Sequence, residues 1–212
     1  MYVPNAFRQD DRDALHAFMR QYSFATLVTG GDEPFATHLP LLLDPARGPH
    51  GTLVGHFARP NPHWELDHGR WESLAIFHGP HAYISPSWYR SGLPAVPTWN
   101  YAAVHAIGRL SIVHDPARVA AVLERTVHAY EAHRPRPWTT DSLAQDAKDK
   151  LIVSVVAFEM PIERLEGKFK LGQNRKREDQ IGAIEGLEAS SDAESVALPK
   201  FARKQLGMPR EG

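Results

Sequence analysis

The chain contains no cysteine among its 212 residues. This absence excludes disulfide bonds, a catalytic thiolate and any zinc site built on sulfur. No apolar run approaches the roughly twenty residues that a membrane helix needs, and the start MYVPNAFRQDD lacks the apolar stretch of a signal peptide. The formal net charge of -1 argues against a surface that traps nucleic acid as a whole. We therefore expect a cytoplasmic protein without a membrane segment.

Signatures of common catalytic machinery are also missing. There is no GxSxG, P-loop or Rossmann glycine motif and no convincing helix-turn-helix pattern. None of the twelve histidines shows an HExxH or comparable spacing. His38 and His56 would converge only if their two strands paired in the right register. The sequence therefore predicts no metal site and leaves the catalytic residues unknown.

What is present is the composition of an ordinary globular domain, with 42% hydrophobic and 23% charged residues. Alternating apolar residues between turn signals predict six strands, at residues 24–29, 35–43, 52–58, 73–79, 100–114 and 151–160. Helical spacing predicts helices near residues 10–21, 116–133 and 141–150 and in the second half of 166–187. Because βαβ alternation is missing, we expect a mainly β fold with flanking helices, an antiparallel, closed or partly closed barrel. The domain should span residues 1–187, followed by a polar, partly mobile tail at 188–212.

Residues 83–105 form the segment richest in aromatic residues and proline, YISPSWYRSGLPAVPTWNYAAVH. Aromatic rings supply contact area at a low entropic cost, and proline fixes the backbone that carries them. Such a segment suits a rigid wall for a planar ligand, or a well-packed loop over the core. The residue types alone leave both interpretations open.

The segment ARPNP at residues 58–62 follows a predicted strand directly. Arg59 offers a bidentate cation, and a turn that leads into a short helix offers backbone N–H groups, so a phosphate could bind here. Pro60 and Pro62 remove two of those donors, and a single loop arginine is more often a solvated surface charge.

The segment KFKLGQNRKR at residues 168–177 is basic. It could contact nucleic acid, an anionic cofactor or only solvent. Gln173 and Asn174 beside Arg175 add the directional hydrogen bonding that the edge of a heterocycle requires.

Six blocks in this order resemble one family, the PaiB-type proteins, which are FMN-binding negative transcriptional regulators. The blocks are MYVPNAF, FATHLP, HFARPNPHW, GPHAYISPSWY, VPTWNYAAVHAIG and KLGQNR. The resemblance covers about residues 1–187. It implies a six-stranded split β-barrel of the FMN-binding type, related to pyridoxamine-phosphate oxidase and the flavin reductases. It also implies a homodimer that holds FMN at the subunit interface.

The same resemblance implies which residues contact FMN. Those along the ring are Thr37, His38, Leu39 and Pro40. Those at the phosphate are Ala58, Arg59 and Asn61. Those that line the other side, with a contribution across the dimer, are Trp99, Asn100 and Tyr101. Those that close over the pocket are Gln173, Asn174 and Arg175. The oxidases place more Ser, Arg and Lys around the phosphate, where this chain has prolines.

Two functions follow from the resemblance. The first is an FMN-binding transcriptional repressor, which contacts DNA directly through residues 168–177 or through a partner. The alternative is an FMN-dependent oxidoreductase or flavin reductase, since a flavin brings its own redox chemistry and needs no evident acid–base pair. A third interpretation, a flavin-free binding module, follows from the prolines in the phosphate loop.

Overall fold

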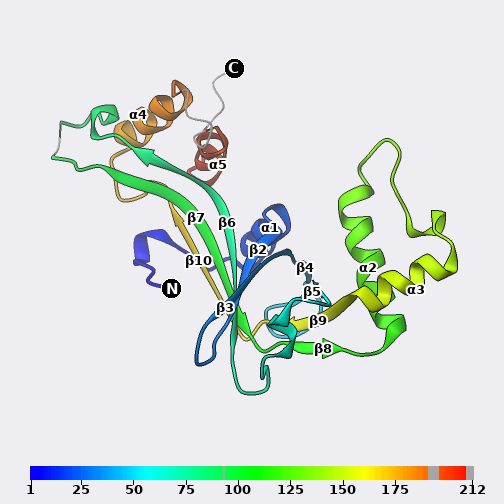
Figure 1. Ribbon diagram of the computed structural model, residues 1–212. Helices are drawn as coiled ribbons and strands as arrows, with labels where there is room; N and C mark the ends of the chain where they lie inside the picture. The colour runs from blue at the N-terminus through cyan, green and yellow to red at the C-terminus, as the bar shows by residue number, and fades with distance from the viewer. Residues whose placement is uncertain (93, 191–195, 209–212) are drawn as a thin grey trace. The chain divides into compact units, whose positions relative to one another are not determined.

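The computed structural model describes residues 1–92, 94–190 and 196–208 (Figure 1). The chain forms two compact units. The first unit comprises Met1–Leu15, His78–Val104 and Glu166–Gly212, and the second comprises His16–Phe77 and His105–Leu165. Helix α1 and strands β6, β7 and β10 each contribute residues to both units.

The second unit contains the predicted β-hairpin. Strands β2 (Phe24–Thr29) and β3 (Phe35–Pro40) pair antiparallel, with Thr26 opposite His38 and Leu27 opposite Thr37. The turn residues GGDEP between the two strands reverse the chain. The other edge of β2 pairs with the start of β6 (Ser73–Ile84), where Thr29 lies opposite Ser73. This hairpin confirms the sequence-based prediction for residues 24–29.

A second, four-stranded sheet also belongs to this unit. Its order is β4 (Leu42–Asp44), β5 (Thr52–Ala58), β9 (Val155–Pro161) and β8 (Ser111–Val113), and each neighbouring pair is antiparallel. Strand β5 lies inside this sheet, between β4 and β9, and most of its residues are buried.

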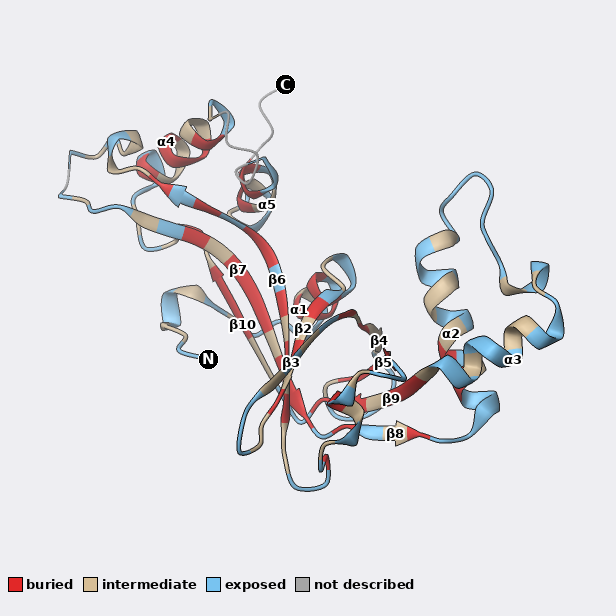
Figure 2. Cartoon of the chain, viewed as in Figure 1, coloured by how far each residue is buried: buried red, intermediate tan, exposed pale blue. Residues whose placement is uncertain are grey.

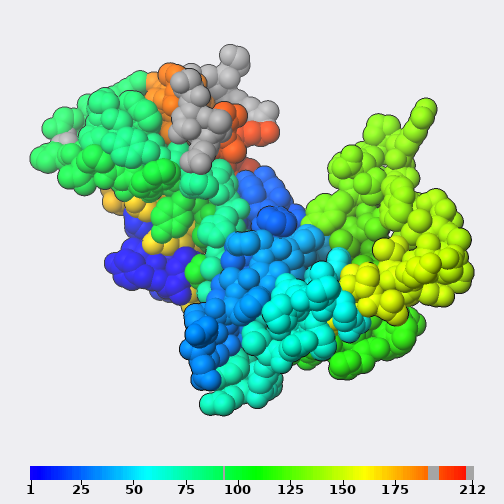
Figure 3. All heavy atoms as spheres, in the orientation of Figure 1, coloured from blue at the N-terminus to red at the C-terminus, as the bar shows by residue number. Residues whose placement is uncertain are grey.

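Three helices flank these strands. They are α1 (Arg12–Gln21), α2 (Pro116–Glu131) and α3 (Gln145–Ser154). Asp11 caps α1, with its Oδ1 accepting from the backbone N–H of Asp13 at 2.9 Å, as its position before an apolar helical repeat predicts. Asp115 caps α2 in the same way and is followed by proline at the first helical position. Helices α2 and α3, green and yellow in Figure 3, lie side by side in this unit.

The first unit contains the remaining strand segments. Strand β1 (Arg8–Gln9) pairs antiparallel with β10 (Arg164–Lys170), and the order continues through β7 (Thr98–Gly108) to β6. Buried residues follow one another along β6, β7 and β10, as the red bands in Figure 2 show. These strands therefore supply the core of the unit.

Helices α4 (Arg177–Glu188) and α5 (Ala197–Gln205) pack against each other in the first unit. Helix α4 also contacts the short helix η3 (Pro86–Trp88). Asp179, which is 1% exposed, accepts hydrogen bonds from the backbone N–H groups of Arg90 and Ser91 at 2.8 and 2.7 Å. Burial opposes its ionisation, but these bonds and that from the Ser91 hydroxyl outweigh burial and lower the pKa of Asp179.

The other short 3-10 helices are η1 (Asn5–Phe7), η2 (Pro62–Glu65) and η4 (Thr140–Ser142). No helix in the described ranges is both long enough and apolar enough to span a membrane.

Several predicted boundaries are wrong. The apolar run at residues 151–154 belongs to α3 and not to the last strand, which begins at Val155. The strand predicted over 73–79 continues to Ile84, so part of the aromatic segment is strand. In the strand predicted over 100–114, Gly108 is the expected position of a bulge or bend, and the strand is interrupted directly after it. Strands β1 and β10 were not predicted.

The fold class itself is as predicted: mainly β, antiparallel, with flanking helices. Ten strands in sheets of six and four occur among the described residues, where the sequence predicted six. In the tail, residues 197–205 form α5, whereas residues 191–195 and 209–212 lie outside the described part, so the predicted mobility there and the domain boundary at residue 187 stay predictions.

Candidate functional site

Strand β3 carries the first group of predicted ring contacts, Thr37 to Pro40, in the second unit. Successive side chains on a strand point to opposite faces. The exposed His38 faces Thr26 across the hairpin, and its Nδ1 lies 3.0 Å from Thr26 Oγ1. Thr37 is half-buried on the other face, and Leu39 is 5% exposed. Thr37 and His38 therefore present their polar atoms on different faces of the strand.

Asn61 connects the phosphate segment to Thr37. Its side-chain Oδ1 accepts from the backbone N–H of His63 at 3.0 Å and caps η2. Its Nδ2 donates to Thr37 Oγ1 at 3.1 Å. The structure thus brings together two predicted site residues that lie 24 positions apart in the sequence.

His63 is a residue that the sequence analysis did not single out. Its ring is fully buried and links two threonines, with Nδ1 at 2.8 Å from Thr37 Oγ1 and Nε2 at 2.7 Å from Thr29 Oγ1. The hydroxyl of Thr29 lies 2.6 Å from that of Ser73. The only local signal for His63 was the Asn-Pro pair before it, which favours the start of a helix. The hydrogen bond to Thr29 could not be predicted, because it depends on how the strands pair.

Burial keeps the His63 ring neutral. Desolvation, with a smaller contribution from the nearby His68, lowers the pKa of His63 to about 4. The two rings lie 6.2 Å apart between centroids. Both ring nitrogens of His68 are also buried.

The low pKa of His63 predicts a pH dependence of stability. The unfolded chain binds this proton near pH 6.5, whereas the folded chain binds it only near pH 4. The free energy of unfolding should therefore fall as the pH falls through this window. From these two pKa values we expect His63 to account for about 1 to 2 kcal/mol of the loss between about pH 7 and pH 5. Urea titrations of the wild type and His63→Asn test this, and equal pH slopes in the two proteins would contradict it.

Arg59 follows the end of β5 and is exposed. Its Nε and Nη2 donate to the backbone carbonyl oxygens of Val153 and Val155 at 3.1 and 2.7 Å, and its guanidinium lies over the Trp64 ring at 5.6 Å. These two bonds use two of its five N–H donors and hold the side chain in place. Arg59 is therefore an ordered cation at the surface with donors left for an anion. The neighbouring Ala58 is also exposed.

The remaining predicted residues lie in the first unit. Asn100, Asn174 and Arg175 line a hollow of about 100 Å³ together with Phe7, Tyr89, Val96, Thr98, Lys170 and Gly172. Lys170 donates to the hydroxyl of Thr98 and, at 2.7 Å, to the carbonyl oxygen of Trp99. Burial and the nearby Lys168 lower the pKa of Lys170. The Arg175 guanidinium lies over the Tyr89 ring at 4.7 Å. This hollow combines cations and amides and suits an anionic, hydrogen-bonding ligand.

Gln173, Trp99 and Tyr101 have other contacts in the same unit. The Gln173 Oε1 accepts from Leu171 N at 2.7 Å, and its Nε2 donates to the carbonyl oxygen of Phe169, so the amide closes the turn after β10. Trp99 is 50% exposed and meets Tyr83 edge to face. Tyr101 receives Lys168 Nζ over its ring at 5.2 Å.

The thirteen predicted residues thus form two groups. Seven lie in the second unit, around Thr37 and the end of β5, and six lie in the first unit, around Asn100 and the turn after β10. Within residues 1–92, 94–190 and 196–208, no three His, Asp or Glu side chains are placed to hold a metal ion.

The donors in both groups fit FMN. A guanidinium with donors to spare suits a phosphate dianion, as at Arg59 and Arg175. Hydroxyl and amide groups, such as those of Thr37, Asn61 and Asn100, suit the polar edge of a heterocycle. Arg59 offers a phosphate fewer than its five N–H donors, because its Nε and Nη2 already donate to the carbonyl oxygens of Val153 and Val155.

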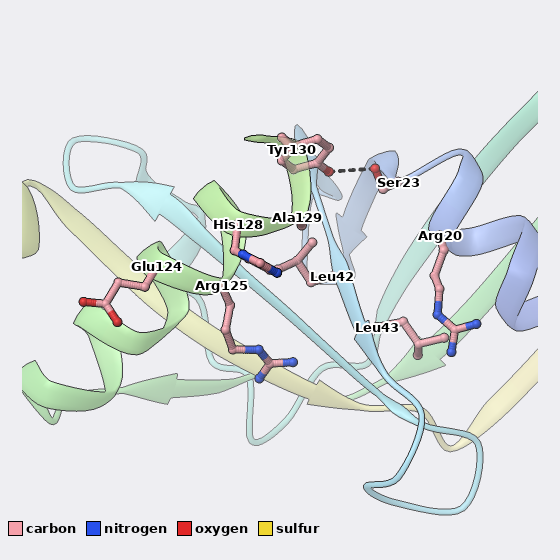
Figure 4. A pocket seen from close by; sticks show the side chains of 9 residues that line it. All are labelled: Arg20, Ser23, Leu42, Leu43, Glu124, Arg125, His128, Ala129 and Tyr130. Carbon is pink, nitrogen blue, oxygen red and sulfur yellow. Dashed lines mark hydrogen bonds between the residues drawn. The ribbon is translucent and has the colours of Figure 1, made fainter. Parts of the chain in front are cut away.

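A larger hollow of about 580 Å³ in the second unit contains none of the predicted residues (Figure 4). Leu42 and Leu43 of β4 and side chains of α2 line it. The hydroxyls of Ser23 and Tyr130 meet at 2.6 Å across it, and Arg125 pairs with Asp44 at 3.8 Å. These contacts attach α2 to β4 and to the start of β2. The hollow is large, but its polar side chains serve to attach α2, so the cluster of predicted residues around Thr37 is the better candidate site.

Comparisons with known proteins agree with this interpretation. Residues 1–164 match a family described as "Putative FMN-binding domain". Among solved structures, the flavocytochrome Anf3 from Azotobacter vinelandii has a TM-score of 0.58 at 15% identity, over 81% of this chain and 73% of its own. The FAD and heme binding protein from Mycobacterium smegmatis has a TM-score of 0.57 at 15% identity, over 83% and 79%. The fold is therefore that of the split-barrel flavin proteins.

A bacterial relative matches the chain over almost its whole length. The chain is 34% identical over 207 residues to "Protease synthase and sporulation protein PAI 2" of Bacillus subtilis (strain 168), and the match covers 97% of this chain and 98% of that protein. The chain belongs to the PaiB-type FMN-binding family, as its six sequence blocks predicted, and the cofactor of this family is FMN.

Proposed function

We propose that this chain binds FMN through the residue group around Thr37 and acts as a negative transcriptional regulator of the PaiB type. The observation that carries the FMN site is the hydrogen-bonded cluster of Thr37, Asn61 and His63, in which two predicted FMN contacts are fixed by one buried histidine. Such pre-arranged polar groups at a half-buried surface are typical of ligand sites.

Each part of the site has a distinct task in this proposal. Arg59 binds the phosphate, while Thr37 and Asn61 orient the ring through hydrogen bonds. The family resemblance also implies FMN contacts at Trp99, Asn100 and Tyr101 and at Gln173, Asn174 and Arg175. These six residues lie in the first unit, and their part in FMN binding stays a prediction. When bound, FMN supplies redox chemistry, because its ring takes up and releases electrons.

A fluorescence titration with FMN tests the site. The wild type should quench the flavin emission at a defined stoichiometry, and Asn61→Leu should weaken binding at least several-fold because Thr37 loses its fixed partner. Thr126→Val is the control, since the Thr126 hydroxyl donates to the Val122 carbonyl oxygen within α2 and Thr126 is not among the predicted FMN contacts. No quenching by the wild type, or equal losses in both variants, would contradict the proposed site.

The regulatory role draws support from the relative's name, which refers to protease synthesis and sporulation. Direct DNA contact by residues 168–177 has less support from the structure. Lys168 is 8% exposed and donates to the Tyr2 carbonyl oxygen, Lys170 is bonded to β7, and Arg177 donates to the Leu206 carbonyl oxygen. Because these cations already have partners within the protein, we expect such a repressor to reach DNA through a partner protein or through another surface.

Salt-dependent binding to DNA decides between these routes. If the protein contacts DNA directly, its affinity for its own upstream region should fall steeply with salt. Binding to neither this region nor random DNA, by the pure protein with or without FMN, would contradict direct repression and leave repression through a partner.

An FMN-dependent oxidoreductase or flavin reductase is the second candidate function. The favouring observation is the neutral histidine that lies 2.8 Å from Thr37, because a neutral imidazole beside a flavin contact can adjust its proton to the redox state of the ring. Oxidation of NADH or NADPH with FMN present would support this function, and no turnover with either donor would exclude a reductase of nicotinamide type.

The proposal includes a cytoplasmic homodimer. The exposed aromatic residues Tyr83 (43%) and Trp99 (50%) on β6 and β7 would be covered in a dimer, which favours association through this face. Sedimentation at micromolar concentration tests it, and a monomer would contradict it. If the protein dimerises but does not bind FMN, the flavin-free binding module becomes the better description.

A further inference from the structure

Four side chains in the second unit form a continuous chain of hydrogen bonds. Thr37 Oγ1 lies 2.8 Å from His63 Nδ1, His63 Nε2 lies 2.7 Å from Thr29 Oγ1, and Thr29 Oγ1 lies 2.6 Å from Ser73 Oγ. His63, Thr29 and Ser73 are all 0% exposed, and only Thr37 reaches the surface. We call these four residues the Thr37 relay.

Asn61 fixes the hydrogen-bond roles at the surface end of the relay. The backbone N–H of His63 can only donate, so the Asn61 atom that it meets at 3.0 Å is the carbonyl oxygen. The amide nitrogen of Asn61 is then the donor to Thr37 Oγ1 at 3.1 Å. Thr37 therefore always accepts one hydrogen bond from Asn61. Its second lone pair and its own O–H proton remain for hydrogen bonds to His63 and to a ligand.

The tautomer of His63 decides how Thr37 uses them. A neutral imidazole carries one proton, on Nδ1 or on Nε2. With the proton on Nδ1, the ring donates to Thr37, both lone pairs of Thr37 are used, and its O–H is left to donate to a ligand. With the proton on Nε2, Thr37 donates to Nδ1, and its second lone pair is left to accept from a ligand.

We propose that the Thr37 relay lets Thr37 reverse its polarity, from donor to acceptor, toward the ring of bound FMN. This inference rests on the proposed FMN site. The ring nitrogens N1 and N5 of an oxidised flavin accept hydrogen bonds, whereas a reduced flavin carries an N–H group at N5 that donates, so a contact of fixed polarity to N5 would suit only one form. In both arrangements each hydroxyl keeps one proton and the imidazole stays neutral. The reversal therefore leaves no buried charge, which would be costly.

Ser73 influences which tautomer His63 adopts, and this can be tested without FMN. When Nε2 carries the proton, Thr29 accepts from His63 and donates its own O–H to Ser73 Oγ. Ser73→Ala removes that acceptor, so the Thr29 O–H should turn to donate to Nε2 instead. The variant should therefore shift His63 toward the tautomer with the proton on Nδ1.

Nitrogen-15 NMR of histidine-labelled protein measures this directly, because protonated and bare ring nitrogens have well-separated chemical shifts. The free wild type, Ser73→Ala and Thr26→Val are compared first. Thr26→Val removes a similar Thr–His hydrogen bond from the same strand but lies outside the relay. We expect a changed tautomer ratio of His63 in Ser73→Ala and no change in Thr26→Val. An unchanged ratio in Ser73→Ala overturns the relay.

The second stage adds FMN to the wild type, first oxidised and then reduced by dithionite. We expect the proton on Nδ1 with oxidised FMN and on Nε2 with reduced FMN, with a neutral ring in both. One tautomer in both states, or a charged ring, overturns the coupling to the ligand. If FMN does not bind, the proposed function fails and the reversal toward FMN fails with it, while the Ser73→Ala result still decides whether the hydrogen-bond chain is coupled.

Discussion

Replacing Arg59 with alanine is expected to weaken FMN binding by about 1.5 to 3 kcal/mol, roughly a 10- to 150-fold rise in Kd. A guanidinium gives a phosphate two charge-assisted hydrogen bonds, and alanine leaves that end of the ligand to water. The side chain is already ordered by its bonds to the Val153 and Val155 carbonyl oxygens, so little rotamer entropy is lost on binding. Isothermal titration with FMN and with riboflavin, which lacks the phosphate, measures the effect.

The comparison with riboflavin separates two roles of Arg59. If Arg59 binds the phosphate, the variant should lose affinity for FMN and keep its affinity for riboflavin. If Arg59 only holds the junction of α3 and β9, both ligands should weaken equally. Arg70→Ala is the matched control, since Arg70 is an exposed arginine of the same unit that stacks on Trp71 at 4.6 Å. An unchanged Kd for FMN in Arg59→Ala would place the phosphate elsewhere.

The sequence predicted elements well where turn residues bound a clear alternation. The hairpin of β2 and β3 is an example, because GGDEP separates two alternating runs. The sequence-based prediction failed at residues 151–154, because a short apolar run has no periodicity that distinguishes a strand from a buried helix. The structure continues α3 through this run to Ser154, whose hydroxyl donates to the Leu151 carbonyl oxygen at 2.8 Å.

The candidate site shows the same limit. The blocks FATHLP and HFARPNPHW contain every member of the Thr37–Asn61–His63 cluster, and the family resemblance singled out two of the three. The role of His63 could not be predicted, because it depends on β2, β3 and β6 meeting in one register. Pairing across strands is set by tertiary packing and not by local propensity.

Charge patterns were equally incomplete as a guide. The sequence predicted a basic, solvent-exposed surface at residues 168–177, yet Lys168 is only 8% exposed. Its Nζ lies 5.4 Å from the centre of the Tyr2 ring and 5.2 Å from that of the Tyr101 ring. A lysine stem can be buried when its ammonium finds a carbonyl oxygen and aromatic faces. Composition alone does not show which cations of a basic segment have such partners.

The helix α4 should depend on a glycine that allows close packing. Gly182 lies against η3, and a Cβ atom at this position would overlap the backbone carbonyl oxygen of Trp88. Because a backbone oxygen cannot rotate away as a side chain can, the helix would have to shift from η3. Overpacking of this kind costs up to about 3 kcal/mol, and the gain of roughly 1 kcal/mol in helix propensity offsets part of it, so we expect Gly182→Ala to lower the free energy of unfolding by about 1 to 2 kcal/mol.

Urea unfolding followed by tryptophan fluorescence measures this loss, and Trp88 itself reports on the packing of η3 and α4. Gly30→Ala is the control, because a Cβ there would meet its nearest atoms at an ordinary 3.8 Å. The hydrogen bonds that Asp179 accepts from Arg90 and Ser91 hold the same segment to α4 from the neighbouring turn, so the helix cannot move away without losing them. A stability of Gly182→Ala equal to or above that of the wild type would show that α4 can shift freely, and that its packing on η3 does not hold the first unit together.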